Sequence, residues 1–311
     1  MEQVTTLLTS RYGLAVAQIE PAPRGWTGET YAATTRDGAR VFVKVYPKDR
    51  LPPTAAAALP VLVELHQLGL TQISRPIPAT SGALHERIGD DLVVVFEYLD
   101  AAPVPFTFGG EQLGDLIARV HEQTRRVASI VARETFEPQC GDELWRTLRR
   151  ARQETASDDP RQGLQRFLDE QENAIADGWA ALGEIARACR ATSFALVVSH
   201  GDWPFNLLQS ADGTVFLIDW DELLLAPAER DTWFAGDDLA FWQGYRARRG
   251  GHAENRLATA YYVHNRYFED LLGAAQVILG DGTFERRSWA LGLLGNDWMA
   301  GLRSRMWNPP A

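Results

Sequence analysis

Cysteine is scarce in this chain, and long apolar runs are missing. The two cysteines, Cys140 and Cys189, lie far apart with neither a CxxC nor a Cys/His spacing, which argues against a disulfide framework and a zinc site. No stretch approaches the roughly 18 uninterrupted apolar residues of a membrane helix, and the first residues lack the basic and apolar regions of a signal peptide. We therefore expect a cytoplasmic protein with no membrane partner.

Several catalytic motifs are also missing. The sequence has no GxxxxGK(S/T) phosphate loop, no GxGxxG turn after a first strand, no GxSxG elbow and no HExxH helix. These absences exclude the corresponding nucleotide-binding loops, the α/β-hydrolase nucleophile and the common zinc protease site.

The chain has fewer positively charged side chains than negatively charged ones. The 311 residues include 41 Asp and Glu against 31 Lys and Arg, which gives a net charge of −10. This charge disfavours nucleic acid as a partner and favours the approach of a cationic small molecule. With 45% hydrophobic residues, a chain of this length can bury a large core in one big domain or two modest ones.

Short β-rich runs dominate the first part of the chain. They read AVAQIEPA, TYAATT, RVFVKVY and DLVVVFEYL, separated by Gly, Pro and Asp-Gly turns that include the hairpin signal RDGAR. Between the third and fourth runs lies TAAAALPVLVELHQLGL, which is helical by composition, although Pro60 should kink the helix or mark its start. The pattern predicts a small antiparallel sheet with one helix.

Helical periodicity prevails after about Leu99. It begins in EQLGDLIARVHEQT and continues to the end of the chain, interrupted only by a β-rich segment at residues 194–220. We therefore expect an α+β protein with a sheet lobe at residues 1–98 and a larger, mostly helical lobe at residues 99–311.

The interrupting segment, SHGDWPFNLLQSADGTVFLIDWDE, concentrates carboxylates. Asp202 and Asn206 share one loop, and Asp219 ends the strand that the SADG turn folds back beside it, so the three side chains can converge. Converging carboxylate and amide oxygens suit Mg²⁺ that is shared with substrate phosphates, which is equipment for phosphoryl transfer. For Asp202 alone, an ordinary turn residue is the better interpretation; for the whole run, function is.

Lysine is almost absent from the basic residues. Of the 31 Lys and Arg residues, only Lys44 and Lys48 are lysines. All the others are arginines. Lys44 lies inside VFVKVY, where its ammonium group could reach a phosphate from the sheet. An outward-facing strand lysine is the usual alternative, and that alternative suffices for Lys48.

The segments around Asp202 and Asp219 resemble a known protein family. SHGDWPFNLL followed by FLIDWDE resembles the phosphotransferase family of aminoglycoside-antibiotic and choline kinases, and LGDLIARVHEQT is similar to that family's helix after the hinge. The resemblance implies a bilobal fold similar to that of protein kinases, with Asp202 as the catalytic base and Asn206 and Asp219 as Mg²⁺ ligands. It also implies that Lys44 contacts the phosphates of ATP or GTP.

A narrower resemblance concerns the substrate. IDWDELLLAPAERDTWF and SRPIPATSGALHERIGDDLVVVFEYLDA resemble the spectinomycin phosphotransferase branch of the family. They imply a cationic aminoglycoside or aminocyclitol acceptor, spectinomycin first, and a place in antibiotic resistance.

The catalytic loop departs from the kinase pattern. Asn206 follows Asp202 by four residues where kinases have five, and Trp203, Pro204 and Phe205 stand between them. Either Pro204 tightens the loop and leaves Asn206 in place, or metal binding depends on Asp219 and weakens.

Further candidates for nucleotide binding come from the sheet lobe. RGWTGETY offers small residues and hydroxyl donors for a phosphate-covering loop, although a plain hairpin turn is the stronger alternative. Glu64 could pair with Lys44 as in kinases; the alternative is that it lies on a solvated helix face. The candidates are Gly25, Thr27, Gly28, Thr30, Glu64 and, at the hinge, Glu97 and Leu99.

Acids beyond the cluster are candidates for the acceptor site. Asp221 and Glu222 follow Asp219 closely in the sequence. Asp238 could add to an acidic wall of the acceptor site, unless it caps the helix that begins at LAFWQGY. Asp231 is expected to hold the catalytic loop from beneath.

Three functions remain open. The first is a monomeric or homodimeric antibiotic kinase that uses Mg²⁺ with ATP or GTP. The second is a metabolic kinase for choline, a sugar or an amino-acid alcohol. The third is a catalytically inactive kinase-like binding protein, which the shortened loop makes credible.

Overall fold

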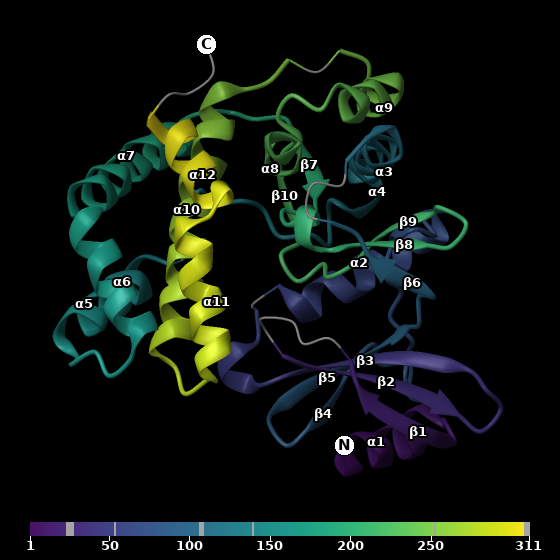
Figure 1. The fold of residues 1–311 in the computed structure, drawn as a ribbon. Coiled ribbons are helices and arrows are strands. Elements are labelled where there is room, and N and C mark those ends of the chain that lie inside the picture. The colour runs from purple at the N-terminus through teal and green to yellow at the C-terminus, as the bar shows by residue number, and fades with distance from the viewer. Residues whose placement is uncertain (23–27, 53, 106–108, 139, 252, 308–311) are drawn as a thin grey trace. The chain divides into compact units, whose positions relative to one another are not determined.

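The computed structural model describes residues 1–22, 28–52, 54–105, 109–138, 140–251 and 253–307 (Figure 1). The contacts between Cα atoms group the chain into two compact units, residues 1–134 with 195–252 and residues 135–194 with 253–311. The chain thus leaves the first unit, builds part of the second and returns. A lobe boundary between residues 98 and 99 remains a prediction.

The first unit opens with strands and two helices. Its first elements are α1 (Glu2–Tyr12), β1 (Val16–Pro21), β2 (Glu29–Thr35), β3 (Arg40–Tyr46), a 3₁₀ turn (Lys48–Arg50), α2 (Ala55–Gln67), β4 (Glu86–Ile88) and β5 (Asp91–Glu97). The strands pair antiparallel in the order β1-β2-β3-β5-β4. The small antiparallel sheet predicted from the sequence is confirmed.

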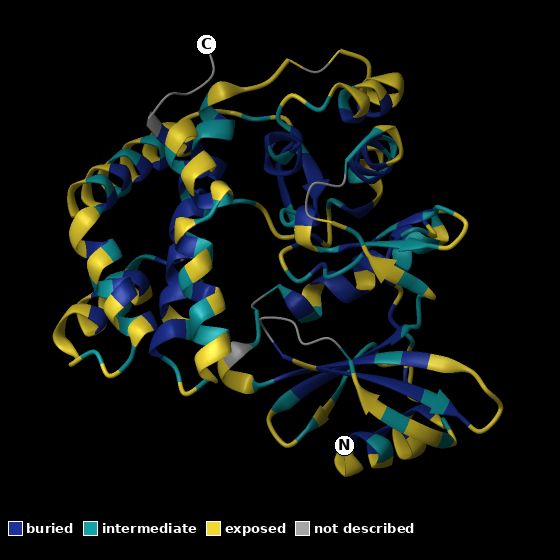
Figure 2. Cartoon of the chain, viewed as in Figure 1, coloured by how far each residue is buried: buried dark blue, intermediate teal, exposed yellow. Residues whose placement is uncertain are grey.

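The central strands of this sheet, β3 and β5, are buried on both of their faces (Figure 2). Alternate residues of a strand point to opposite faces. Val41, Val43 and Val45 of β3 pack toward α1, whereas Tyr46 belongs to the core that includes α2. Lys44 therefore lies on the same face as Tyr46. Helix α1 was not predicted from the sequence.

Helix α2 continues through Pro60 and begins at Ala55, so the proline does not mark its start. A proline at this position removes one intrahelical N–H donor. The helix is nevertheless retained because its apolar face is buried, with Leu59, Leu62 and Leu65 in the core. Burial of three leucines outweighs the loss of one hydrogen bond.

The rest of the first unit carries the carboxylate segment. Its elements are β6 (Ala101–Pro103), α3 (Glu111–Glu122), α4 (Thr124–Val127), β7 (Leu196–Ser199), a 3₁₀ turn (Trp203–Phe205), β8 (Leu207–Ser210), β9 (Val215–Leu217), β10 (Leu224–Pro227), α8 (Glu229–Thr232), a 3₁₀ turn (Trp233–Ala235) and α9 (Leu239–Arg249). β7 pairs with β10, and β8 lies between β6 and β9. Strand β6, just after the hinge, was not predicted.

The second unit is helical. Its elements are α5 (Gly141–Gln153), α6 (Asp159–Glu170), α7 (Glu172–Arg190), α10 (Arg256–Leu279), α11 (Phe284–Gly295) and α12 (Asp297–Trp307). Trp179 joins Trp145 and Phe268 through edge-to-face contacts with ring centroids 5.8 and 5.0 Å apart. The predicted helical content is confirmed. Among the described residues, no helix combines the length and apolar character needed to cross a membrane.

Helices α3 and α9 approach each other through two glycines. A Cβ atom on Gly114 would lie 2.0 Å from the carbonyl oxygen of Phe241, and one on Gly244 would lie 2.0 Å from that of Glu111. Both obstacles are backbone atoms, so a side chain at either position would force the helices apart. This contact matters for the site because α3 and α9 support the carboxylate segment from the same core.

We expect Gly114→Ala and Gly244→Ala each to lower the free energy of unfolding by about 1–3 kcal/mol or more, because overpacking here displaces backbone. The measurement is urea unfolding followed by circular dichroism. Gly183→Ala in α7 is the matched control, since nothing lies within 4 Å of its added Cβ; alanine there should stabilise the helix by about 0.5–1 kcal/mol. Equal midpoints for Gly114→Ala and Gly183→Ala would contradict the packing argument.

Candidate active site

The loop after β7 is held from below by a buried carboxylate. Asp231 is fully buried and accepts hydrogen bonds from the backbone N–H groups of His200, at 3.1 Å, and Gly201, at 2.6 Å. Its carbonyl oxygen also accepts from the indole N–H of Trp203 at 2.7 Å. Asp231 therefore fixes the start of the loop that carries Asp202, the role expected from the sequence.

Asp231 is itself supported by a histidine that sequence reasoning missed. His121 of α3 lies with Nε2 2.9 Å from the Asp231 carboxylate and Nδ1 2.8 Å from the Tyr245 hydroxyl. Burial alone would raise the pKa of Asp231, but the His121 hydrogen bond and charge, with the Gly201 N–H, lower it below its usual value. The carboxylate is therefore retained as an anion. Only the helical pattern around His121 was visible in the sequence.

His200 orders the loop backbone and is not placed as a base. The Asp202 N–H donates to Nδ1 at 3.1 Å, so Nε2 carries the proton that it donates to the carbonyl oxygen of Ile218, at 2.8 Å. Burial lowers the pKa of His200, although Asp231 opposes the shift. A neutral histidine thus ties the loop to the residue that precedes Asp219.

The shortened loop still brings Asn206 to Asp202. Residues Trp203–Phe205 form a 3₁₀ turn with Pro204 in its first positions, and this tight turn spans the gap with one residue fewer. The Asn206 Nδ2 donates to the Asp202 carbonyl oxygen at 2.7 Å and to its carboxylate at 3.1 Å. Of the two alternatives that the sequence left open, the geometry supports a tightened loop with Asn206 in place.

Backbone pairing brings Asp219 to the same end of the strands. The Ile218 N–H donates to the Asn206 carbonyl oxygen at 2.9 Å, and Leu207 pairs with Leu217. Asp219 then takes a positive φ of 62°, which Asp tolerates better than most residues. The strand register therefore delivers Asn206 and Asp219 together.

Lys44 of strand β3 contacts Asp219 and the nearby Asp221. Its Nζ lies 2.6 Å from Asp219 Oδ1 and 2.8 Å from Asp221 Oδ2, and its side chain is 6% exposed. Burial lowers the pKa of Lys44, but the charges of Asp219 and Asp221 outweigh burial and raise the pKa above its usual value. Lys44 is thus a buried cation, not an outward-facing strand lysine.

Asp221 is less exposed than Asp219, with side-chain exposures of 13% and 30%. Burial and the negative charge of Asp219 raise the pKa of Asp221 to about 6, although Lys44 and Tyr46 oppose the shift. The hydroxyl of Tyr46 donates to Asp221 Oδ1 at 2.6 Å. Tyr46, which alternation places beside Lys44, was missed in the sequence.

The donor set fits a divalent cation. Asn206 points its amide nitrogen at Asp202, so its own Oδ1 is available. Asp219 accepts from Lys44 with Oδ1, so its Oδ2 is available. Neither the Asn206 Oδ1 nor the Asp219 Oδ2 accepts a hydrogen bond from the described part of the chain. Within that part, no group of three or more His, Cys, Asp and Glu side chains is arranged to hold a metal. One carboxylate and one amide suit Mg²⁺, which takes its remaining ligands from phosphates and water.

Other predicted nucleotide-site residues lie elsewhere or have structural partners. Glu64 is half-buried on α2, and among described residues Lys44 pairs with Asp219 and Asp221 and not with it, so the expected kinase-like pair is absent. Glu97 forms an ion pair with Arg75 at 2.9 Å. The Leu99 carbonyl oxygen accepts from the Ala101 N–H at 2.9 Å.

The candidate phosphate-covering loop is only partly described. Gly25 and Thr27 lie outside the described residues. A Cβ atom on Gly28 would lie 2.2 Å from the carbonyl oxygen of Val45, so this glycine is required by close backbone approach. Thr30 is buried in β2, where its hydroxyl donates to the Ala22 carbonyl oxygen at 3.2 Å.

The acids proposed for the acceptor site differ in their surroundings. Asp238 is the N-cap of α9: Oδ1 accepts from the N–H groups of Ala240 and Phe241 at 3.0 Å each, and Oδ2 accepts from Gly110 at 2.9 Å. The helix-capping alternative therefore describes Asp238. Glu222 is half-exposed and lies 3.4 Å from the Arg230 guanidinium.

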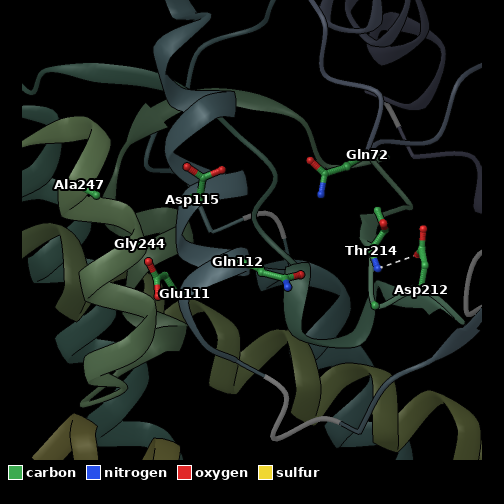
Figure 3. A pocket seen from close by; sticks show the side chains of 9 residues that line it. Gln72, Glu111, Gln112, Asp115, Asp212, Thr214, Gly244 and Ala247 are labelled. Atoms are coloured by element: carbon green, nitrogen blue, oxygen red, sulfur yellow. Dashed lines mark hydrogen bonds between the residues drawn. The ribbon is translucent and has the colours of Figure 1, made fainter.

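A separate surface pocket contains none of the predicted site residues (Figure 3). Its volume is about 400 Å³, and α3, α9 and the β8–β9 turn contribute to its lining. Two of its polar side chains already have partners: Arg119 donates to Gln72, and Arg248 donates to Asp115. We assign no site to it.

Two features of this site are typical of a kinase-like phosphotransferase. One is a buried lysine of the sheet that contacts the Asp following a strand. The other is a loop that joins an Asp to an Asn. The chain belongs to the phosphotransferase enzyme family, whose model matches residues 18–265. Enzymes of this family transfer phosphate to hydroxyl groups of small molecules, so the prediction of a phosphotransferase that acts on an alcohol group is confirmed. No curated protein matches the sequence of this chain.

Solved structures share the fold along the whole chain. A spectinomycin phosphotransferase in complex with ADP and spectinomycin superposes with a TM-score of 0.77 at 19% identity, covering 98% of each chain. An aminoglycoside phosphotransferase from Alicyclobacillus acidocaldarius gives 0.59 at 20% identity, covering 96% of this chain and 92% of that one. An amicoumacin kinase with AMP-PNP and Ca²⁺ gives 0.63 at 13% identity, with 98% and 92% covered. The predicted α+β, protein-kinase-like fold is confirmed.

Proposed function

We propose that this protein is a small-molecule kinase that transfers the γ-phosphoryl group of ATP or GTP to a hydroxyl group of a cationic aminoglycoside or aminocyclitol antibiotic, with spectinomycin first. The observation that supports this best is the fold shared over 98% of both chains with a spectinomycin phosphotransferase bound to ADP and spectinomycin. The net charge of −10 favours a cationic acceptor. We also propose that it works in the cytoplasm, where ATP and GTP are available.

The residues of the cluster receive distinct roles in this proposal. Asp202 orients the acceptor hydroxyl and takes its proton as the oxygen attacks the γ-phosphorus. Lys44 binds the donor phosphates. Asn206 and Asp219 would hold Mg²⁺, which supplies neutralisation of phosphate charge when bound. The side chains are fixed before substrate arrives, so catalysis rests on positioning and electrostatic stabilisation.

A metabolic role is the second candidate. An aminopropanol kinase and a choline/ethanolamine kinase family protein share the fold, with TM-scores of 0.58 and 0.55 at 16% and 13% identity. Amino alcohols are also cationic hydroxyl compounds, so the charge of this chain suits them as well.

Mass spectrometry of an acceptor panel tests the proposal. The purified protein is incubated with Mg²⁺, with ATP or GTP, and with spectinomycin, several aminoglycosides, choline, aminopropanol and simple sugars. We expect a mass increase of one phosphoryl group on spectinomycin or an aminoglycoside, with no increase when the Asp202→Asn variant replaces the wild type.

The alternatives give different products. An adduct on choline or aminopropanol with none on the antibiotics would replace the antibiotic role with a metabolic one. Nucleotide binding without an adduct on any member of the panel would favour the inactive binding protein.

A further inference from the structure

The position of Lys44 is held by a second carboxylate that is distinct from the predicted metal ligand. Lys44 Nζ contacts Asp219 and Asp221 at 2.6 and 2.8 Å. If Asp219 takes up a divalent cation, its attraction for the lysine is weakened, because the cation competes for the same carboxylate. Asp221 then remains as the anionic partner of Lys44.

Asp221 is fixed more firmly than a flexible surface acid. Oδ1 accepts from the Tyr46 hydroxyl at 2.6 Å while Oδ2 accepts from Lys44. Its backbone carbonyl oxygen accepts from the hydroxyl of Thr54, next to the start of α2. Contacts on side chain and main chain leave this carboxylate a single orientation, with one oxygen aimed at the lysine.

Tyr46 links the anchor to the strand that bears the lysine. It lies two residues after Lys44 on the same face of β3, it is 2% exposed, and its ring centroid is 4.7 Å from Lys44 Nζ. Strand, tyrosine, aspartate and lysine thus close a ring of contacts. Glu64, which would fill this position in a protein kinase, makes no ion pair with Lys44 among the described residues.

We propose that Asp221, oriented by Tyr46 and Thr54, is the positioning residue that holds Lys44 extended toward the donor phosphates, in the place expected for Glu64. This role rests on the proposed function, since it requires a phosphate-binding lysine. It replaces the acceptor-site role that the sequence suggested for Asp221.

Calorimetric binding of ADP and adenosine, each measured with Mg²⁺ and with EDTA, tests the proposal on Asp221→Asn. We expect ADP affinity to fall about tenfold to a hundredfold, the loss typical of a hydrogen bond to a charged group. The fall should be larger with Mg²⁺ than with EDTA, because without the cation Asp219 still attracts Lys44. Adenosine affinity should not change, because the lysine contacts only phosphates. Tyr46→Phe should give a smaller fall in the same direction, about twofold to fivefold, and decides the matter if Asp221→Asn does not fold.

Asp90→Asn is the matched control. Asp90 is the carboxylate partner of the only other lysine, Lys48, at 2.9 Å in an exposed pair, and ADP affinity should not change. Combining Asp221→Asn with Lys44→Ala should weaken ADP binding no further than Lys44→Ala alone, because both substitutions remove one interaction.

Several results would overturn the proposal. If Asp221→Asn weakens ADP binding further in the Lys44→Ala background, with Mg²⁺ but not with EDTA, Asp221 is a metal ligand. An equal loss for adenosine would show general damage. A loss with Glu64→Gln as large as with Asp221→Asn would return the anchor role to Glu64. If wild type and Asp221→Asn bind ADP equally, the anchor role alone fails, whereas a wild type that binds no nucleotide would remove the proposed function as well.

Discussion

Replacing Asp202 by Asn should lower the turnover number about 10²–10⁴-fold, the range of a general base, while Mg²⁺-dependent nucleotide binding stays close to that of the wild type. An amide cannot accept the proton of the acceptor hydroxyl. The fold should be retained, because the side-chain oxygen of the asparagine can still accept from the Asn206 amide, which also bonds the backbone carbonyl of residue 202. The measurement is the rate of phosphorylation at saturating nucleotide and acceptor.

Asp237→Asn is the control with the same change in charge. Asp237 is exposed and precedes the cap of α9, so its variant should turn over at the wild-type rate. A turnover number for Asp202→Asn within about twofold of the wild type would remove Asp202 from the chemistry. A parallel loss of nucleotide affinity would instead place it in binding.

Much of the fold was predictable because it depends on local pattern. Strands β2, β3 and β5 are rich in β-branched and aromatic residues, and turn residues separate them. The long helical runs also follow from periodicity. Helix α1 and strand β6 escaped prediction because α1 is weakly patterned and β6 has three residues, and each is stabilised by tertiary packing and pairing.

The site was predictable where strand order alone brings residues together. One turn places Asn206 against Asp202, and strand pairing places it beside Ile218, which precedes Asp219; both relations could be argued from spacing. The rarity of lysine singled out Lys44.

Contacts over long separations were not predictable. Lys44 and Asp221 are 177 residues apart, so their pairing depends on how the sheet and the carboxylate segment dock, which no local pattern records. For the same reason Glu64 was the natural expectation from the kinase analogy. Asp238 shows the opposite error, because a local capping pattern described it better than a functional one.

The glycines of α3 and α9 show a third kind of limit. Helix propensity alone disfavours a glycine inside a helix such as α3 or α9. In the structure Gly114 and Gly244 each let a backbone carbonyl of the other helix approach. The physical reason for these residues is a close contact, which becomes visible only when both helices are placed.

Replacing Asp219 by Asn should lower Mg²⁺-dependent turnover by about a thousandfold or more, since a metal ion supplies several kcal/mol of transition-state stabilisation. Asparagine is the informative substitution because φ is 62° at this position, a left-handed conformation that Asn accepts and Ala does not. Lys44 keeps Asp221 as its partner, so the buried cation is not left unpaired. The measurements are the turnover number and the affinity for ADP with Mg²⁺ and with EDTA.

The effect of Mg²⁺ on ADP affinity distinguishes Asp202→Asn from Asp219→Asn. Wild type and Asp202→Asn should both bind ADP more tightly with Mg²⁺ than with EDTA, whereas Asp219→Asn should bind it equally in the two conditions. Both variants are slow, so turnover alone cannot separate a base from a metal ligand, but the response to Mg²⁺ can. If Asp219→Asn keeps the full Mg²⁺ effect on ADP affinity, the cation is held elsewhere and Asp219 acts only through its ion pair with Lys44.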